Sequence, residues 1–251
     1  MEVTKELKER RERVFLVLAG IFLCAMTMLN ILGITRFIQL GYLSLAVGVL
    51  PYPLTFLCTD LISELYGRAR ANFLVTIGLG LNFFIIGTLW IASLIPSVAP
   101  EIQPPWQVIH LAESIALPDG DSVEDSVELF TLLYATTSGA VFASMMAYIA
   151  AQYCDVFMFH FWRKITGGKH LWLRNNGSTV ISQGVDSFMV ITVTFGASFL
   201  AGAISLGAML MLMWHNYMFK LCVALADTLP FYVGVHYLKR YLEFTDEELA
   251  A

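Results

Sequence analysis

Charged residues are scarce in this sequence. Of its 251 residues, 14% are charged and 57% are hydrophobic, whereas soluble domains average about 25% charged residues. Residues 14–32 contain no charged side chain, and neither do residues 73–95. A hydrocarbon layer of about 30 Å takes roughly 20 helical residues, so both runs are long enough to cross it. The scarcity of charge therefore excludes a soluble globular domain and predicts a single-domain, all-α integral membrane protein.

The sequence also lacks the motifs of several enzyme classes and sites. The glycine-rich stretch at 78–87 has no lysine of the kind that a nucleotide-binding P-loop requires. In the same stretch Leu81 stands where an intramembrane aspartyl protease, a remote alternative, would need an aspartate of its carboxylate pair. The cysteines form no CxxC pair and lie in or at apolar runs: Cys24, Cys58, Cys154 and Cys222. We therefore expect no enzymatic activity, no cofactor, no metal site, no disulfide and no nucleic-acid partner.

Six segments are predicted to be transmembrane helices: 14–32, 42–66, 73–95, 130–153, 178–200 and 214–238. All but two of the 15 basic residues lie on one side of these segments, and Arg36 and Lys220 are the exceptions. The loop at 97–128 is acidic and contains neither Lys nor Arg. The positive-inside rule places the basic side in the cytoplasm. Both termini are then cytoplasmic, and we expect a multi-pass protein of a bacterial or archaeal plasma membrane.

This topology divides the chain into parts. Residues 1–13 are predicted to be a cytoplasmic N-terminal segment, residues 14–240 the transmembrane domain and residues 241–251 an acidic cytoplasmic tail. The extracytoplasmic loop at 97–128 is predicted to hold a short interfacial helix at 106–115. On the cytoplasmic side, Gly167 and Gly168 are predicted to turn the chain after an extension of the fourth span.

Two prolines interrupt the second predicted span. Pro51 and Pro53 flank Tyr52, and proline removes a backbone donor and breaks a helix interior. Irregular backbone at membrane depth persists only where protein or a water-filled cavity satisfies it. The prolines therefore indicate either a discontinuous helix, as at many transporter binding sites, or a simple kink.

Ionisable residues inside the apolar segments are the strongest functional signal. A charge at the centre of a membrane helix costs about 2.5–3.5 kcal/mol on insertion scales, so its presence there suggests function. Five such residues stand in predicted spans: Asp60, Glu64, Asp186, Lys220 and Asp227. Counted from the basic side at the helical rise, Asp60, Asp186 and Asp227 lie at comparable depths on three different helices. We therefore expect these three acids to converge on one polar cavity, with Asp155 a borderline addition.

The spacing of these residues suggests partners. Glu64 precedes Arg68 by four residues, so a structural ion pair on one helix is the alternative to a role in binding. Asp60 has no local partner. Lys220 and Asp227 lie two helical turns apart, too far to pair, and Lys220 is predicted to neutralise an acid on another helix. Gln183 and Asp186 share one face of the fifth span.

Three motifs stand in order along the chain: TDLISELYG (59–67), WLRNNGSTVISQGVD (172–186) and Lys220-x6-Asp227-Thr228. Together they resemble the queuosine precursor transporter family, also called vitamin-uptake-transporter-like, and the resemblance runs from about residue 14 to residue 240. It departs in one place, since the proline stands at 230 and not directly after the threonine. The family implies six transmembrane helices with a fold similar to the substrate-binding components of energy-coupling-factor vitamin transporters. It also implies uptake of 7-deazaguanine bases such as preQ0 and preQ1 for tRNA modification.

The resemblance turns the intramembrane residues into a candidate substrate site. The 7-deazaguanine ring has two adjacent N–H donors on one edge, and a carboxylate can accept both hydrogen bonds. We expect Asp60 or Glu64 to bind this edge, Gln183 and Asp186 to complete the polar contacts, and Lys220 and Asp227 to adjust the charge. Arg174, Asn175 and Asn176 are predicted either to gate the cytoplasmic mouth or to cap the fifth helix. The sequence leaves open another flat vitamin- or purine-like solute, a binding subunit with a separate energising partner, and a homodimer.

Overall fold

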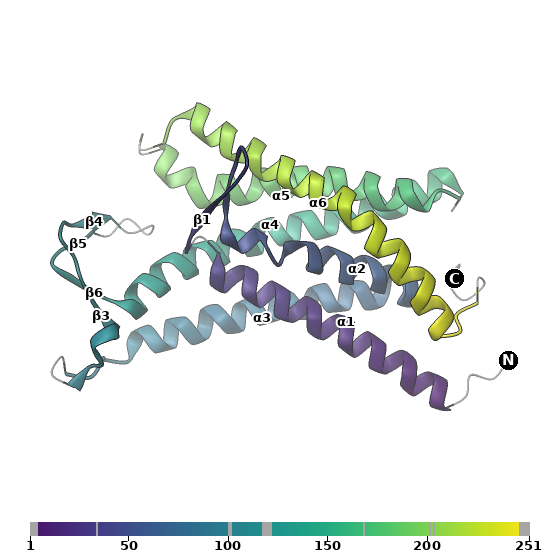
Figure 1. The fold of residues 1–251 in the computed structure, drawn as a ribbon, viewed down its shortest axis with the longest axis horizontal. Coiled ribbons are helices and arrows are strands. Elements are labelled where there is room, and N and C mark those ends of the chain that lie inside the picture. Colours follow the sequence, from purple (N-terminus) through teal and green to yellow (C-terminus); the bar gives the residue numbers. More distant parts are fainter. Residues whose placement is uncertain are drawn as a thin grey trace.

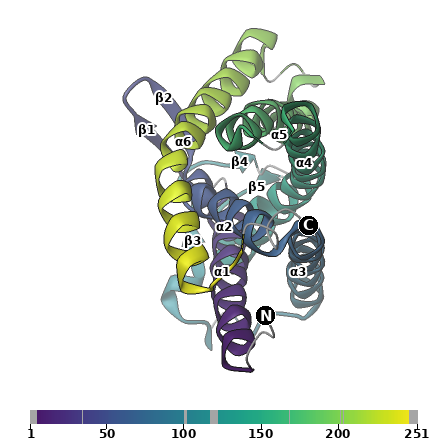
Figure 2. The same cartoon turned by 90° about the vertical axis from the view of Figure 1, so that its right-hand side faces the viewer.

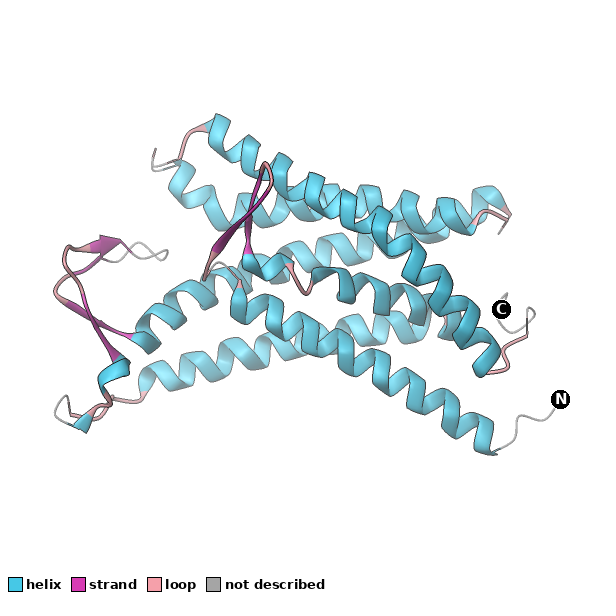
Figure 3. Cartoon of the chain, viewed as in Figure 1, coloured by secondary structure: helices cyan, strands magenta, loops and turns pink. Residues whose placement is uncertain are grey.

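Six helices form an elongated bundle in the computed structural model (Figure 1; Figure 3). The structure describes residues 5–33, 35–99, 102–116, 122–167, 169–200, 202 and 204–245, without the side chains of residues 116, 122, 140, 171, 175, 197 and 198. The helices run as follows: α1 Lys5–Leu32, α2 Tyr52–Tyr66, α3 Arg68–Leu94, α4 Leu129–Thr166, α5 Leu171–Leu200 and α6 Leu206–Tyr241. Five of these, all except α2, are long and apolar enough to cross a membrane. The protein is therefore a multi-pass membrane protein, as predicted.

The second predicted span differs from the other five. The structure confirms a helix only over Tyr52–Tyr66, which is 15 residues long, or about 22 Å at the usual helical rise. Residues 43–46 form a strand and residues 47–49 a 3-10 turn. The prolines explain the difference, because Pro51 and Pro53 are tolerated at the start of a helix but not in its interior. A helical span over 42–66 was thus wrong before residue 52, where a strand and a 3-10 turn stand in place of either a broken or a kinked helix.

A hairpin fills the space in front of α2. Strands β1 (Phe37–Leu40) and β2 (Leu43–Ala46) pair antiparallel, and the 3-10 turn η1 (Val47–Val49) leads from them toward α2. Gly48 lies against the end of α1, where an added Cβ would come within 2.9 Å of the carbonyl oxygen of Leu29. The hairpin is therefore held close to α1 and beside α6 (Figure 2).

The acidic loop forms two small sheets at one end of the bundle (Figure 1). The chain passes through the 3-10 turn η3 (Pro105–Gln107); then β3 (Val108–His110) pairs with β6 (Ser126–Glu128), and β4 (Ile115–Ala116) with β5 (Ser122–Val123). The predicted helix at 106–115 was wrong, since only a single turn forms there. The β-branched residues Val108 and Ile109 favour a strand, and Ile109 is paired with the buried Val127.

Several helices begin earlier than the apolar runs predicted. α1 begins at Lys5, since the Lys, Glu and Arg residues before its apolar run are good helix formers. α5 begins at Leu171 and not at 178. α6 begins after Ser205, whose hydroxyl accepts a hydrogen bond from the backbone N–H of Ala208. Gly167, in the left-handed conformation with φ of 57°, ends α4 and confirms the predicted turn; Gly168 lies outside the described residues.

The short helix α2 lies in the middle of the bundle, in contact with α1, α3 and α6 (Figure 2). The apolar core sits where these four helices meet. Phe22 and Met26 of α1, Ile62 of α2 and Phe231 of α6 are buried together in this core. Both ends of α2 are therefore fixed by packing, which positions the carboxylates that it carries.

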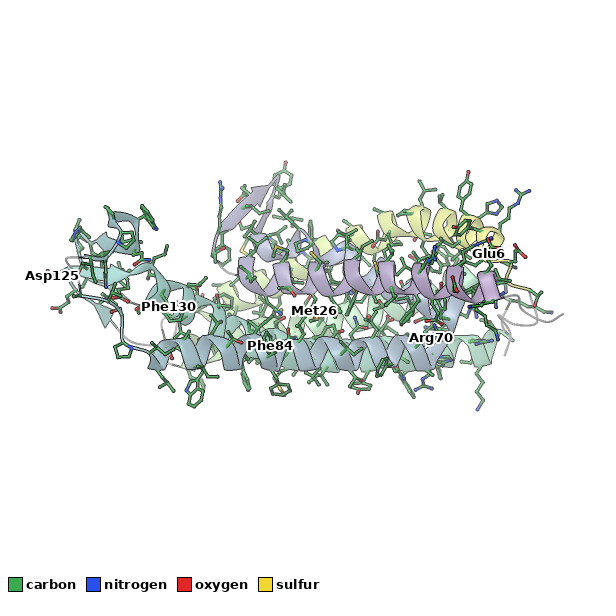
Figure 4. All side chains as sticks on the ribbon, turned by 90° about the horizontal axis from the view of Figure 1, so that it is seen from below. Glu6, Met26, Arg70, Phe84, Asp125 and Phe130 are labelled. Atoms are coloured by element: carbon green, nitrogen blue, oxygen red, sulfur yellow. The ribbon has the colours of Figure 1, made fainter. Side chains whose placement is uncertain are left out.

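The start of α1 is tied to the end of α6. Arg10 donates to the carbonyl oxygen of Tyr241 (3.2 Å), and Arg11 donates to those of Leu242 (3.0 Å) and Glu243 (3.0 Å). The guanidinium of Arg11 also lies 3.9 Å from the ring centroid of Phe244. We call Arg10, Arg11 and residues 241–244 the clasp. It lies at the end of the bundle marked by Glu6 and Arg70, opposite Asp125 (Figure 4).

Gly67 is the single residue between α2 and α3, and its φ of 83° and ψ of 169° lie where only glycine is unstrained. We expect Gly67→Ala to lower the free energy of unfolding by about 1–3 kcal/mol through backbone strain alone, because no atom lies within 4 Å of the added Cβ. The matched control is Gly80→Ala in α3, which also has open space and should be neutral or stabilising. Thermal unfolding in detergent measures both, and equal midpoints would contradict the strain.

Candidate functional site

A polar layer crosses the interior of the bundle near the middle of α5 and α6. Lys220 of α6 is 4% exposed and forms an ion pair with Asp186 of α5. The Lys220 ammonium also lies over the ring of Tyr52, 4.4 Å from its centroid. The Tyr52 hydroxyl in turn donates to Oε1 of Gln183, at 2.7 Å. We call Tyr52, Gln183, Asp186 and Lys220 the central polar layer; it confirms that Lys220 neutralises an acid on another helix.

The local sequence explains this arrangement. The prolines start α2 at Tyr52, so an amphipathic side chain stands at the first position of the shortened helix. Gln183 and Asp186 are three residues apart on α5, so both point toward α2 and α6. A buried ammonium and carboxylate are tolerated when they are paired and hydrogen-bonded. The layer thus joins α2, α5 and α6 by polar contacts at membrane depth.

An apolar cavity lies on the hairpin side of the central polar layer. Its volume is about 130 Å³, and it is bounded by the end of α1, the hairpin, α5 and α6. Tyr52, Lys220 and Asn216 supply polar groups to it, and most of its other lining is apolar, including Phe37 and Phe195. The cavity has room for one small flat molecule.

A smaller central cavity of about 40 Å³ lies between α1, α2, α3, α4 and α5. It shares Tyr52 with the apolar cavity and is also lined by Asp186, Asn82, Tyr148 and Gln152. Asn82 accepts a hydrogen bond from Nδ2 of Asn30 at 2.6 Å. Among the residues that the structure describes, neither the Tyr148 hydroxyl nor Nε2 of Gln152 has a hydrogen-bond partner.

A much larger cavity of about 870 Å³ lies toward the clasp, and we call it the basic-end cavity. Its inner wall carries Asp60, Glu64 and Asp155, together with Arg174 of α5. Further basic residues line the same cavity: Lys8, Arg11, Arg68, Arg70 and Arg163. The charged lining of this cavity is therefore mixed, and its Lys and Arg residues outnumber its acids, which also include Glu12.

Glu64 pairs with a different arginine from the one that its spacing suggested. Its carboxylate lies 3.8 Å from the guanidinium of Arg174, which also lies over the ring of Phe159 at 5.3 Å. The predicted alternative, a Glu64–Arg68 pair, assumed one continuous helix. Gly67 ends α2 between the two residues, so Arg68 begins α3 and does not follow Glu64 on a helix face.

The intramembrane acids occupy two compartments and not one. Asp60 interacts electrostatically with Asp155, Asp227 and Glu64, while Asp186 lines the central cavity. Asp155 accepts a hydrogen bond from the Ser182 hydroxyl at 2.9 Å. In the described part of the chain Asp60 has neither a hydrogen bond nor an ion pair with a cation. Convergence of three acids on one cavity was therefore wrong, because Asp186 is turned toward Lys220.

Two predicted residues near the start of α5 have different outcomes. The side chain of Asn175 lies outside the described residues. Asn176 is buried; its Oδ1 accepts from the hydroxyl of Thr228 (2.9 Å) and its Nδ2 donates to the carbonyl oxygen of Trp172 (3.2 Å). Asn176 thus connects α5 to α6, next to Asp227, and does not cap α5, which begins five residues earlier.

The sequence analysis missed the neutral polar residues of the site. These are Tyr52, Asn30, Asn82, Tyr148 and Gln152. A single amide or phenol in an apolar run is a weaker signal than a charge. The signal that was present is the position of Tyr52 between two prolines and the lone glutamine in the middle of α4.

Comparisons with known proteins give one family and one relative. Residues 46–234 match the model of a family described as "Putative vitamin uptake transporter". A protein of Bacillus subtilis (strain 168) described as "Probable queuosine precursor transporter" is 26% identical over 165 residues, which cover 65% of this chain and 62% of that protein. The chain thus matches less than two thirds of the length of this relative. No solved structure matches the chain significantly.

Proposed function

Since this chain belongs to the vitamin uptake transporter family, which is a family of membrane transporters and not of enzymes, we propose that it imports queuosine precursors. The substrates would be 7-deazaguanine bases such as preQ0 and preQ1, taken up across the plasma membrane for tRNA modification. The name of the Bacillus subtilis relative supports this substrate class. The resemblance of the three motifs at 59–67, 172–186 and 220–228 supports it independently of that name.

The proposed topology has six crossings with the basic end in the cytoplasm. The five long helices cross the membrane, and α2 with the preceding hairpin completes a sixth crossing. Basic residues flank the ends of α1, α3, α4 and α6 on the clasp side, and the positive-inside rule places that side in the cytoplasm. The basic-end cavity then opens inward. The likeness to substrate-binding components of energy-coupling-factor transporters stays a prediction, as no solved structure matches.

The observation that carries the proposed function is that Asp60 lines the basic-end cavity without a hydrogen-bond or ion-pair partner among the described residues. A guanine-like ring has a ring N–H and an exocyclic amino group side by side, and a carboxylate accepts both. Glu64 is engaged by Arg174 and Asp155 by Ser182, whereas Asp60 lines the basic-end cavity with no such partner in the described chain. We therefore assign the ring edge to Asp60 and give Glu64 the role of holding Arg174.

The central polar layer divides the route of the substrate. It lies between the apolar cavity on the hairpin side and the basic-end cavity on the other. Lys220 and Asp186 form a neutral pair, so a neutral flat ring passes them without an uncompensated charge. Tyr52 and Phe56, with ring centroids 4.9 Å apart, provide flat surfaces beside this route. The apolar cavity and the basic-end cavity share no lining residue, which supports a barrier to the substrate at the layer.

Uptake by intact cells tests the proposed function. We expect cells that cannot make preQ0 or preQ1 to accumulate the radiolabelled bases when they express this protein, and to regain queuosine in their tRNA. The control is the same cells with an empty vector, and membrane fractions must show that the protein is present. Accumulation no greater than in the control, with the protein in the membrane, would contradict the proposal.

The printed description of the family supports a second candidate, the import of another flat vitamin-like solute on the same scaffold. A ligand that binds only the folded state raises the unfolding temperature. Thermal-shift measurements on the purified protein with 7-deazaguanines, purines and vitamins therefore distinguish the two candidates. The proposed function requires that the 7-deazaguanines give the largest shift.

A further inference from the structure

Two buried polar atoms face the central cavity without a partner. Tyr148 and Gln152 stand four residues apart on α4, so they lie on the same face of that helix. Gln152 is 3% exposed, and both its Nε2 and the Tyr148 hydroxyl lack hydrogen bonds within the described chain. Buried donors are nearly always paired, since leaving one unpaired costs stability. Such atoms in a binding protein indicate the position of a ligand's polar groups.

The neighbouring polar groups are already engaged. The oxygen of the Gln183 amide accepts from Tyr52, and Asn82 accepts from Asn30. Asp186 uses Oδ2 for Lys220, and its carboxylate also interacts with the hydroxyl of Tyr52, so a movement of Tyr52 would free it as an acceptor at the wall of the same cavity. The cavity thus offers a donor from Gln152 and an acceptor from Asp186. This pattern is complementary to a ring that has a carbonyl oxygen beside an N–H.

We propose that the central cavity is the closed form of the pocket that recognises the ring, and that Gln152 determines specificity by donating from Nε2 to the ring carbonyl oxygen. Asp186 accepts from the adjacent ring N–H, and the Tyr148 hydroxyl pairs with a further polar atom of the ring. This inference rests on the proposed function and names the feature of the substrate that is selected: a carbonyl group and not an amino group at that ring position.

The cavity must widen to hold a bicyclic ring. It has a volume of about 40 Å³, and the adjoining apolar cavity has about 130 Å³. Tyr52 lines both cavities, so a movement of this side chain joins them. When the central polar layer opens toward the basic-end cavity, the edge of the substrate ring passes from Asp186 to Asp60. The two acids thus serve successive positions of one substrate.

The test uses two ligands that differ only on the edge that Gln152 and Asp186 would bind. These are 7-deazaguanine and 7-deaza-2,6-diaminopurine, in which an amino group replaces the ring carbonyl and the adjacent ring nitrogen is an acceptor in place of a donor. We expect the wild-type protein to prefer the carbonyl ring by about 10- to 100-fold in binding, since the amino group would face the donor of Gln152. Thermal shifts of the purified protein and competition with labelled preQ0 uptake both measure this ratio.

Two variants of Gln152 test the assignment of the donor. Gln152→Met removes it, so the preference should fall by about 10-fold, to the part that Asp186 maintains, and binding of the carbonyl ring should weaken by about 10-fold or more. The unfolding temperature without ligand should stay the same or rise, since an unpaired buried amide is removed. Gln152→Glu offers an acceptor in place of the donor and should lower the preference further than Gln152→Met does. The control Gln107→Met changes an exposed glutamine of the loop and should keep the wild-type ratio.

The outcomes separate this inference from the proposed function. If the wild-type protein imports preQ0 and Gln152→Met keeps the wild-type ratio of the two ligands, the inference is overturned and the proposed function stands. A Gln152→Met protein that unfolds at lower temperature and keeps the wild-type ratio would show a structural role only, which also overturns the inference. If the wild-type protein neither imports preQ0 nor binds 7-deazaguanine, the proposed function itself fails.

Discussion

Replacement of Lys220 by methionine should abolish uptake and lower the free energy of unfolding by about 3–5 kcal/mol, the usual cost of leaving one partner of a buried ion pair uncompensated. Lys220 is 4% exposed, and it is the cation that neutralises Asp186 in the central polar layer. It also lies over the ring of Tyr52. Its loss therefore removes two of the three contacts described in the layer and leaves the hydrogen bond between Tyr52 and Gln183. Thermal unfolding in detergent and preQ1 uptake measure the two effects.

A second substitution separates folding from function at this site. In Lys220→Met/Asp186→Asn no charge is left in the central polar layer, so most of the lost stability should return. Uptake should stay at background, because Asp186 can no longer accept from the ring N–H as a carboxylate. The control Lys164→Met removes an exposed lysine and should change stability by no more than about 0.5 kcal/mol. Full uptake by the double variant would contradict the role given to the layer.

Substitution of Asp60 by asparagine should lower uptake by about 100-fold, since one carboxylate oxygen becomes an amide that repels the N–H donors of the ring. Stability should not fall. Asp60 stands among Asp155, Asp227 and Glu64, so loss of its charge reduces repulsion between like charges. A variant that is at least as stable as the wild type but does not import is the expected result of uptake and thermal unfolding measured together.

Glu64→Gln is the matched control for Asp60→Asn, because it makes the same change one helical turn away. Glu64 is paired with Arg174, so we expect a modest loss of stability and a smaller loss of uptake than for Asp60→Asn. Wild-type uptake by Asp60→Asn would remove this residue from the site. A greater loss of uptake in Glu64→Gln than in Asp60→Asn would transfer the ring edge to Glu64.

The long helices could be predicted because hydrophobic length alone specifies them. Residues 73–95 and 130–153 contain no charges, and both lie within helices of the structure except for Ile95, which follows the last residue of α3. The region from 37 to 50 could not be predicted in this way. It is as apolar as a transmembrane helix, but it forms a hairpin and a 3-10 turn, and pairing between its own strands decides the outcome. The prolines marked the break without indicating what precedes it.

The site was predictable in kind but not in its pairing. A lysine in an apolar run needs an acid, and that inference led to Lys220 and one of several carboxylates. Lys220 pairs with Asp186 because of the way α5 and α6 face each other. The spacing of residues along one helix gives no information about how two helices pack. The same holds for Glu64 and Arg174, which come from α2 and α5. Contacts between helices that are distant in sequence decide which acid is neutralised and which remains available.

The clasp makes the order of synthesis matter for this fold. The backbone acceptor of Arg10 lies 231 residues further along the chain, which a ribosome needs on the order of 10–50 s to reach. During that time α1 is already made, but the arginines that will hold the end of α6 have no carbonyl groups there to bind. Arg11 and Phe244 both line the basic-end cavity, so the wall of this cavity is completed among the last steps of assembly. A chain that stops short of residue 241 would contain most of its helices and still lack the clasp at the basic end.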